Sequence, residues 1–172
     1  VIEKLFLRRS LQNARFVSTK GERQAPMVDP EEQKKVKLIL AELRDVSKDK
    51  RRTAVMKLGM MGGEDALRAL IRTVENDQED LIVRGRAALM LGKLKDTRAV
   101  SPLIRALEAP GFQTPLNAAQ ALGKIGDPRA IEPLLMFADN SRDKTRDAAL
   151  EALRLLGYEF ATEAEAEPEP EI

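Results

Sequence analysis

The sequence predicts an all-α protein in which pairs of helices stack into an alpha-alpha superhelix. Three observations support this fold class. Similar segments recur every 31–33 residues, each segment carries apolar residues at helical spacing, and the composition is 43% hydrophobic and 33% charged with only 3% aromatic residues. Stacked helical hairpins require this mixture of small apolar and charged side chains.

The repeat is visible as columns of identical residues. The two longest columns are Ala54, Ala87, Ala118 and Ala149, and Leu58, Leu91, Leu122 and Leu153. A third column holds Gly59, Gly92 and Gly123, spaced 33 and 31 residues apart, and Arg154 takes its fourth place. Because independent columns agree on one spacing, we interpret the chain as a repeat protein.

Each repeat is predicted to contain two helices. In the first helix of the third repeat, Leu116, Ala119 and Leu122 recur at helical spacing and form a narrow apolar stripe. Small side chains in this stripe allow a neighbouring helix to approach closely. Gly126 then marks a turn, and Asp127 is placed to cap the second helix with its carboxylate. The second helix carries further Leu and Ile residues into the core.

Beyond the clearest repeats, the pattern weakens toward both ends. Residues 29–44 fit the second helix of a degenerate first repeat, and residues 142–157 fit a first helix without a partner. We therefore divide the chain into a basic amphipathic leader (1–28), a repeat domain (29–158) and an acidic tail (159–172). The tail has alternating acids and no apolar stripe, so we expect it to be disordered or bound to a partner.

Three segments resemble a known repeat. The string LGKIGDPRAIEPLL (122–135) is similar to the HEAT-like repeat of the phycobilisome bilin lyases, LGKLKDTRAVSPLIRAL (91–107) is a second copy, and LGMMGGEDALRALIRTV (58–74) is a weaker third. The resemblance covers about residues 30–157 and implies a short, right-handed HEAT-like solenoid. It is specific for fold and not for function, because the repeat occurs in lyases, adaptors and assembly factors.

The resemblance also implies that second helices line a concave, partner-binding face. The residues expected there are Lys37, Arg68, Arg72, Arg105, Glu108, Glu132 and Met136. One interpretation is that they are ordinary solvated side chains. The other is that Arg68, Arg72 and Arg105 form a basic patch for an acidic segment of a partner, since a guanidinium engages a carboxylate with two hydrogen bonds.

A second set of arginines is given a structural role by the same resemblance. Arg84 and Arg146 lie early in first helices and are expected near the cap aspartates, as a ladder of Asp–Arg pairs between repeats. Pro115 occupies the matching position in the third repeat and would interrupt this ladder.

The leader has the composition of a targeting segment. Residues 1–20 hold five bases and one acid. The apolar residues that cluster at helical spacing are Ile2, Leu5, Phe6, Leu7 and Leu11. These features are typical of a mitochondrial transit peptide, which predicts a mitochondrial location, with a cytoplasmic or plastid location as alternatives. Two other interpretations remain: a first helix of the degenerate repeat, or a basic arm that docks on a partner.

The composition excludes many familiar chemistries. The chain has no Cys and no His, so it cannot hold a disulfide framework, a thiol nucleophile, a Ser-His-Asp triad or an imidazole-ligated metal. A hydroxylase class built on the same repeat requires His-Glu ligand pairs, which are also missing. We therefore expect no enzyme, no catalytic residues, no cofactor and no metal site.

The leading functional interpretation is a protein-binding scaffold or adaptor. It would be an accessory subunit or assembly factor of a larger complex, binding protein partners through the concave face and the open ends of the solenoid. The alternative is a bilin lyase-like chaperone of phycobiliprotein maturation. Nucleic acid is unlikely as a partner, because residues 21–158 hold 24 bases and 21 acids without a clear basic face. No apolar run is long enough to predict a membrane span.

Overall fold

The computed structural model describes residues 30–160, and this part of the chain contains helices and connecting turns but no strand. The helices are α2 (Pro30–Glu42), α3 (Lys48–Met61), α4 (Gly63–Glu75), α5 (Leu81–Leu94), α6 (Val100–Ala106), α7 (Gln113–Ile125), α8 (Ile131–Asn140) and α9 (Asp143–Leu155). The short 3-10 helices η1 (Thr97–Ala99) and η2 (Pro128–Ala130) lead into α6 and α8. The predicted leader and nearly all of the predicted tail lie outside the described residues.

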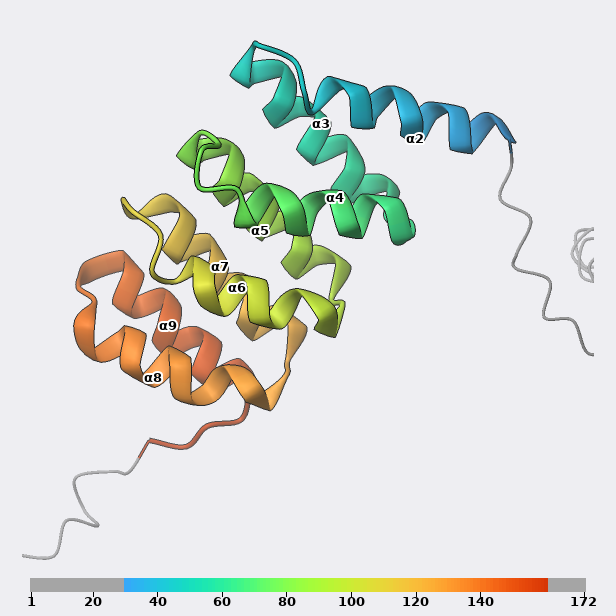
Figure 1. Ribbon diagram of the computed structural model, residues 1–172. Helices are drawn as coiled ribbons and strands as arrows, with labels where there is room; N and C mark the ends of the chain where they lie inside the picture. Colours follow the sequence, from blue (N-terminus) through green and yellow to red (C-terminus); the bar gives the residue numbers. More distant parts are fainter. Residues whose placement is uncertain (1–29, 161–172) are drawn as a thin grey trace, which may run out of the picture.

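The helices form two layers that stack in chain order from α2 and α3 to α8 and α9 (Figure 1). The A helices α3, α5, α7 and α9 pack against one another in one layer. The B helices α2, α4, α6 and α8 form the other, and each of α4, α6 and α8 packs against the A helix that follows it. This arrangement confirms the predicted all-α superhelix of stacked hairpins.

The core coincides with the repeat columns. Leu58, Leu91, Leu122 and Leu153 are fully buried, and so is the alanine column that begins with Ala54. The Leu side chains fill the space between the layers, and each buries enough apolar surface to contribute about 2 kcal/mol. Each alanine lies four residues before the leucine of its helix, so both face the core from the same side of an A helix.

Two helical glycines set the closest approach between A helices. A Cβ atom on Gly92 would lie 2.6 Å from the Cα of Ala121 in α7, and one on Gly123 would lie 2.7 Å from the Cα of Ala152 in α9. Real Cβ atoms do not approach other carbon atoms so closely. Gly92 and Gly123 therefore recur in the sequence because the backbone of α7 packs directly against those of α5 and α9.

The glycine column does not continue into α9, the last described A helix. Arg154 stands where the inner repeats have glycine, and it is exposed beside Glu151. At the opposite end of the stack, Lys57 of α3 occupies the repeat position that Met90 has in α5 and Ala121 has in α7. Those two residues contact the preceding A helix, whereas Lys57 pairs with Glu42 of α2 at 2.8 Å. Each of these two A helices thus carries a charged side chain at a position where the inner repeats have a small or apolar residue.

The turns between paired helices match the sequence prediction. Asp96 and Asp127 accept hydrogen bonds from the backbone N–H groups of Arg98 and Arg129 at 2.9 and 3.0 Å. Each carboxylate therefore satisfies one backbone donor that has no partner within its helix. Within the described residues, no helix is long and apolar enough to cross a membrane.

A glycine at position 95 is expected to stabilise the protein. Lys95 ends α5 with a φ of 55°, whereas Gly126 ends α7 in the same left-handed conformation with a φ of 77°. Because a side chain is unfavourable there, Lys95→Gly should raise the free energy of unfolding by about 1 kcal/mol, measured by urea denaturation. Gly126→Ala should lower it by a similar amount. Equal stability of Lys95→Gly and the unmodified chain would contradict this assignment.

Candidate functional site

All of the residues predicted from the sequence to bind a partner are exposed on the B-helix layer. Lys37 lies on α2, Arg68 and Arg72 on α4, Arg105 on α6, Glu108 just after α6, and Glu132 and Met136 on α8. We call this surface of α4, α6 and α8 the B-helix surface. Exposure alone does not distinguish a binding surface from a solvated one, so the grooves and charges on it decide what it can do.

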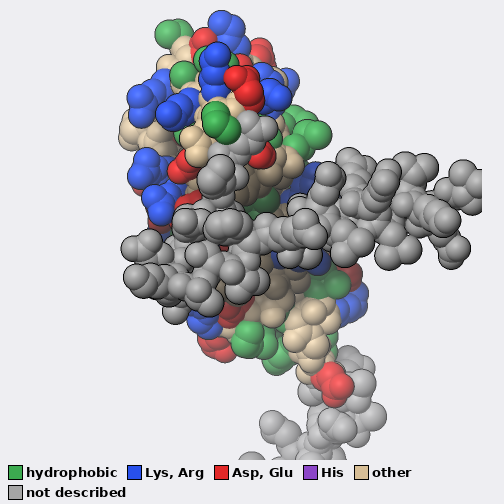
Figure 2. Space-filling model, turned by 90° about the vertical axis from the view of Figure 1, so that its right-hand side faces the viewer, with side chains coloured by type: hydrophobic (Ala, Val, Ile, Leu, Met, Phe, Trp, Pro, Cys, Tyr) green, Lys and Arg blue, Asp and Glu red, His purple; other side chains and the backbone are tan. Residues whose placement is uncertain are grey.

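The three arginines do not form a free basic patch. Arg68 Nε donates to Glu64 Oε1 at 2.8 Å, and Arg105 forms an ion pair with Glu75 of the preceding repeat. Within the described residues, Arg72 has no ion pair. On the face shown in Figure 2, basic side chains are most abundant at the end formed by α2 and α3, and acidic side chains lie among them. Most of the positive charge is therefore compensated locally.

The first groove on this surface is polar. It has a volume of about 430 Å³. Its lining residues are Val74, Glu75, Asp77, Arg84, Pro102, Arg105, Ala106, Glu108, Ala109 and Pro110. They come from the end of α4 and the turn after it, the first turn of α5, and α6 with the turn that follows it. Charged groups thus converge where two B helices meet the next A helix.

Arg84 anchors the floor of this polar groove. It lies in the first turn of α5 and is 4% exposed. Its Nε donates to the carbonyl oxygen of Val74 at 3.1 Å, and its Nη2 pairs with Asp77 Oδ1 at 3.0 Å. The guanidinium therefore satisfies a carbonyl near the end of α4 and ties that helix to α5.

The second groove is apolar. It has a volume of about 330 Å³ and lies between α6 and α8. Its lining residues are Ile104, Leu107, Glu108, Pro133, Met136, Phe137, Asn140 and Ser141. Met136 is 61% exposed at its rim, so an apolar side chain from another molecule could bury it.

The polar and apolar grooves occupy equivalent places in successive repeats. Pro102 and Pro133, Arg105 and Met136, and Ala106 and Phe137 are pairs of lining residues 31 positions apart. Glu108 lines both grooves. The same groove therefore occurs in two successive repeats. Met136 in the second copy takes the place that Arg105 has in the first, and this difference makes the second groove apolar.

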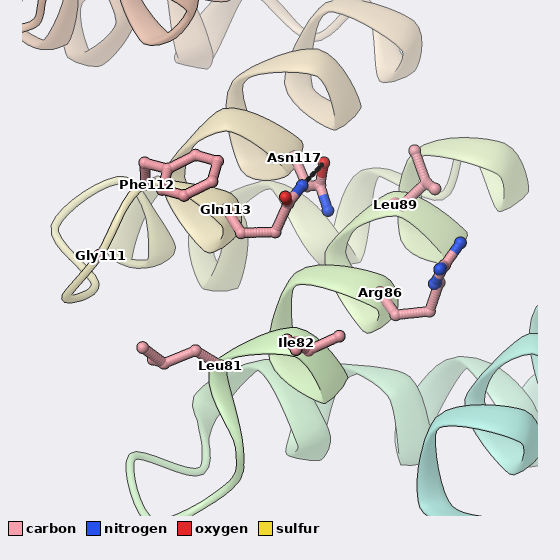
Figure 3. Close-up of a pocket in the computed structure, with 8 residues that line it drawn as sticks. All are labelled: Leu81, Ile82, Arg86, Leu89, Gly111, Phe112, Gln113 and Asn117. Atoms are coloured by element: carbon pink, nitrogen blue, oxygen red, sulfur yellow. Dashed lines mark hydrogen bonds between the residues drawn. The ribbon is translucent and has the colours of Figure 1, made fainter. Parts of the chain in front are cut away.

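A third hollow lies on the other side of the molecule, between the A helices α5 and α7. It has a volume of about 440 Å³ and is lined by Leu81, Ile82, Arg86, Leu89, Gly111, Phe112, Gln113 and Asn117 (Figure 3). Phe112 is 66% exposed. Gln113 Nε2 donates to Asn117 Oδ1 at 3.1 Å, and Asn117 Nδ2 donates to the carbonyl oxygen of Gly85 at 2.8 Å. Asn117 therefore holds α7 against α5, and Gln113 orients the Asn117 side chain.

The predicted ladder of Asp–Arg pairs is wrong, because arginines other than Arg84 and Arg146 bind the cap aspartates. Arg84 binds Val74 and Asp77, because it lies at the start of α5 while Asp96 follows the end of that helix, about 20 Å away. Arg146 makes no ion pair within the described residues. Instead, Arg98 binds its own cap residue Asp96 and donates to Glu64 of the preceding repeat at 2.9 Å.

An arginine in the next repeat joins its hairpin to the preceding one in a similar way. Arg129 binds its cap residue Asp127 and donates from Nη2 to the carbonyl oxygen of Thr97 at 3.2 Å. Near the N-terminal end, Arg51 forms an ion pair with Glu79 at 2.8 Å and donates to the carbonyl oxygens of Asp45 and Val46. Arginines at two different positions of the repeat therefore join neighbouring hairpins.

These pairs also determine the acid–base behaviour of the carboxylates. The Arg98 and Arg68 guanidinium groups lower the pKa of Glu64. Hydrogen bonds from the Arg129 side chain and backbone lower the pKa of Asp127 to about 2. Such carboxylates stay ionised at neutral pH and act as structural anions. Among the described residues, no group of three or more acidic side chains is arranged to hold a metal ion.

The Asp127 pair predicts a pH dependence. Because its pKa is about 2 in the folded chain and about 4 when unfolded, its contribution to stability is complete above pH 4 and is lost as the pH falls toward 2. We expect Arg129→Gln to raise the pKa of the Asp127 carboxyl toward 4, measured by NMR titration. An unchanged Asp127 midpoint in this variant would contradict the role of Arg129.

Sequence reasoning identified three of the groove residues and missed the grooves themselves. Arg105, Glu108 and Met136 were predicted as exposed positions, and the structure brings them to two adjoining hollows. Lys37, Arg68, Arg72 and Glu132 line neither groove. One signal was missed in the sequence. Pro102 aligns with Pro133, and four residues later the small Ala106 aligns with the large Phe137.

Comparison with known proteins identifies the repeat. A sequence model of HEAT repeats matches residues 36–113 and 77–154. Human deoxyhypusine hydroxylase has a similar structure, with a TM-score of 0.65, 24% identity and coverage of 74% of this chain and 45% of its own. The complex of CpcE and CpcF of phycocyanin lyase from Nostoc sp. matches with a TM-score of 0.62 and 28% identity over 83% of this chain and 58% of its own. No curated protein sequence matches significantly.

These likenesses correct one expectation. We had excluded an enzyme from the missing Cys and His residues. A hydroxylase and a lyase share this architecture, so the fold is compatible with catalysis and the exclusion is wrong. The chain spans about half of the length of each matched structure, at 45% and 58%.

Proposed function

The chain belongs to the HEAT-repeat family, and from this premise we propose that it is a protein-binding scaffold that holds a segment of a partner on its B-helix surface. The observation that carries this proposal is the pair of adjoining grooves, about 430 and 330 Å³, placed at equivalent positions of successive repeats. An extended or helical segment that crosses α6 would contact both grooves.

The rigidity of the B-helix layer supports this proposal. Arg84 fixes the end of α4 to the start of α5, and Arg105 pairs with Glu75 across the two repeats that form the polar groove. Grooves held by such contacts exist before a partner arrives, so less conformational entropy is lost on binding. The complex of CpcE and CpcF is an assembly of subunits, which supports a role for this chain as an accessory subunit or assembly factor.

The proposal is tested by photo-crosslinking from two positions. A photoreactive amino acid replaces Met136 at the apolar groove in one variant and Gln120, exposed on the A helix α7, in the other. After irradiation in an extract of the source organism, we expect one partner to be crosslinked through position 136 and not through position 120. Equal labelling from both positions, or labelling from position 120 alone, would refute binding at the B-helix surface.

A second candidate function is suggested by the likeness to the phycocyanin lyase complex, which reaches 28% identity. A lyase-like chaperone would hold a tetrapyrrole, and the hollow between α5 and α7 offers apolar walls at Leu81, Ile82 and Phe112 with Arg86 for a propionate. If this candidate holds, a linear tetrapyrrole should show a shifted absorbance band with the protein and lose it with Phe112→Ala. An unshifted spectrum at micromolar concentrations would exclude it.

A further inference from the structure

The charges at the polar groove indicate what kind of side chain would enter it. Its lining holds the carboxylates of Glu75, Asp77 and Glu108 and the guanidinium groups of Arg84 and Arg105. Arg84 pairs with Asp77, and Arg105 pairs with Glu75. Glu108 has no ion pair within the described residues, so the groove carries one uncompensated negative charge.

The position of Glu108 makes this charge available to a ligand. The side chain is exposed and lines both grooves, so it lies on the ridge between them. The Asp77 side chain is 82% exposed, but Arg84 already pairs with it. A cation in this groove would therefore meet one unpaired carboxylate, that of Glu108, whereas an anion would meet arginines whose charges are already compensated.

The apolar groove adds a second requirement at a fixed distance. Ile104, Leu107, Met136 and Phe137 surround it, and Glu108 is its sole charged lining residue. Because the two grooves are one repeat apart, their centres are separated by about 10 Å, the distance between packed helices. An extended peptide covers this distance in about three residues.

We infer that the partner segment held by the B-helix surface carries a Lys or Arg side chain about three residues from a large apolar side chain. The basic side chain enters the polar groove and pairs with Glu108, and the apolar side chain covers Met136 in the apolar groove. This inference rests on the proposed function, and it reverses the expectation of an acidic partner segment. The reason for the reversal is that Arg68 and Arg105 are paired with carboxylates of this chain.

The experiment is selection from a library of random displayed peptides on the full chain. We expect enriched peptides to contain Lys or Arg two to four positions from Leu, Ile, Met or Phe. Glu108→Lys should weaken the best peptide about five- to tenfold, because it replaces attraction by repulsion at a partly exposed pair. Glu132→Lys is the matched control: it makes the same charge change on α8, lines neither groove and should leave the affinity unchanged.

Three outcomes would count against the inference. Enrichment of acidic or purely apolar peptides would overturn the partner chemistry, while crosslinking from position 136 would still support the binding surface. Equal loss of affinity in Glu108→Lys and Glu132→Lys would show general charge attraction and overturn the groove assignment. Absence of enrichment, together with absence of crosslinking from position 136, would overturn the proposed function as well.

Discussion

Gly92→Ala is expected to lower the free energy of unfolding by about 2 kcal/mol, although alanine normally favours a helix over glycine. The new Cβ would lie 2.6 Å from the Cα and 2.8 Å from the Cβ of Ala121. Because one of these atoms belongs to the backbone of α7, a side-chain rotation cannot relieve the clash. α5 and α7 would have to separate and lose packing along their length. Urea denaturation followed by circular dichroism measures the change.

Gly85→Ala provides the matched control on the same helix. Its new Cβ would meet Asn117 Nδ2 at 3.1 Å and the Cγ and backbone oxygen of Gln113 at 3.3 Å, distances that shifts of a few tenths of an ångström can relieve. The gain in helix propensity should then offset the crowding, and the stability should change by less than about 0.5 kcal/mol. If Gly92→Ala were as stable as Gly85→Ala, the close contact between α5 and α7 would not control the stability of the stack.

Arg84→Met is expected to lower the free energy of unfolding by about 2–3 kcal/mol. The substitution keeps a long apolar stem and removes the charged hydrogen bond to the carbonyl oxygen of Val74, which would then be left without its partner. The ion pair with Asp77 adds little to this loss, because the Asp77 side chain is 82% exposed. The largest effect should be faster hydrogen exchange at the end of α4 and the start of α5.

Arg146→Met makes the same change at the equivalent position of α9. Arg146 is exposed and makes no ion pair within the described residues, so this variant should be within about 0.5 kcal/mol of the unmodified chain. Similar losses in Arg84→Met and Arg146→Met would show that the arginine acts through helix propensity or net charge. The assigned contact with Val74 would then be wrong.

Most of the fold could be predicted because the repeat and the core have the same physical origin. A residue such as Leu91 or Leu122 recurs at one position because that position is buried in every hairpin. The glycine column likewise follows from close packing of successive A helices at Gly92 and Gly123. The cap residues Asp96 and Asp127 were predictable because capping depends on local sequence alone.

The candidate site could be predicted only in part. Exposure of Arg105 and Met136 followed from their place in the repeat, but the grooves depend on how Pro102 and Pro133 meet the end of the preceding B helix. The pairing of Arg105 with Glu75 joins side chains 30 residues apart and decides the charge of the surface. Side-chain pairs of this kind are a property of the assembled stack, which a single-sequence pattern does not specify.

The contacts between hairpins have a consequence for how the protein unfolds. Thr114 donates to the Leu81 carbonyl oxygen and Asn117 to that of Gly85, so these ties join residues 33 and 32 positions apart, from one hairpin to the next. A chain held by nearest-neighbour contacts can lose its terminal hairpin without losing the rest. Since α2 has no buried residue, amide exchange should be fastest there and slowest in α5 and α7, giving a gradient of protection along the stack.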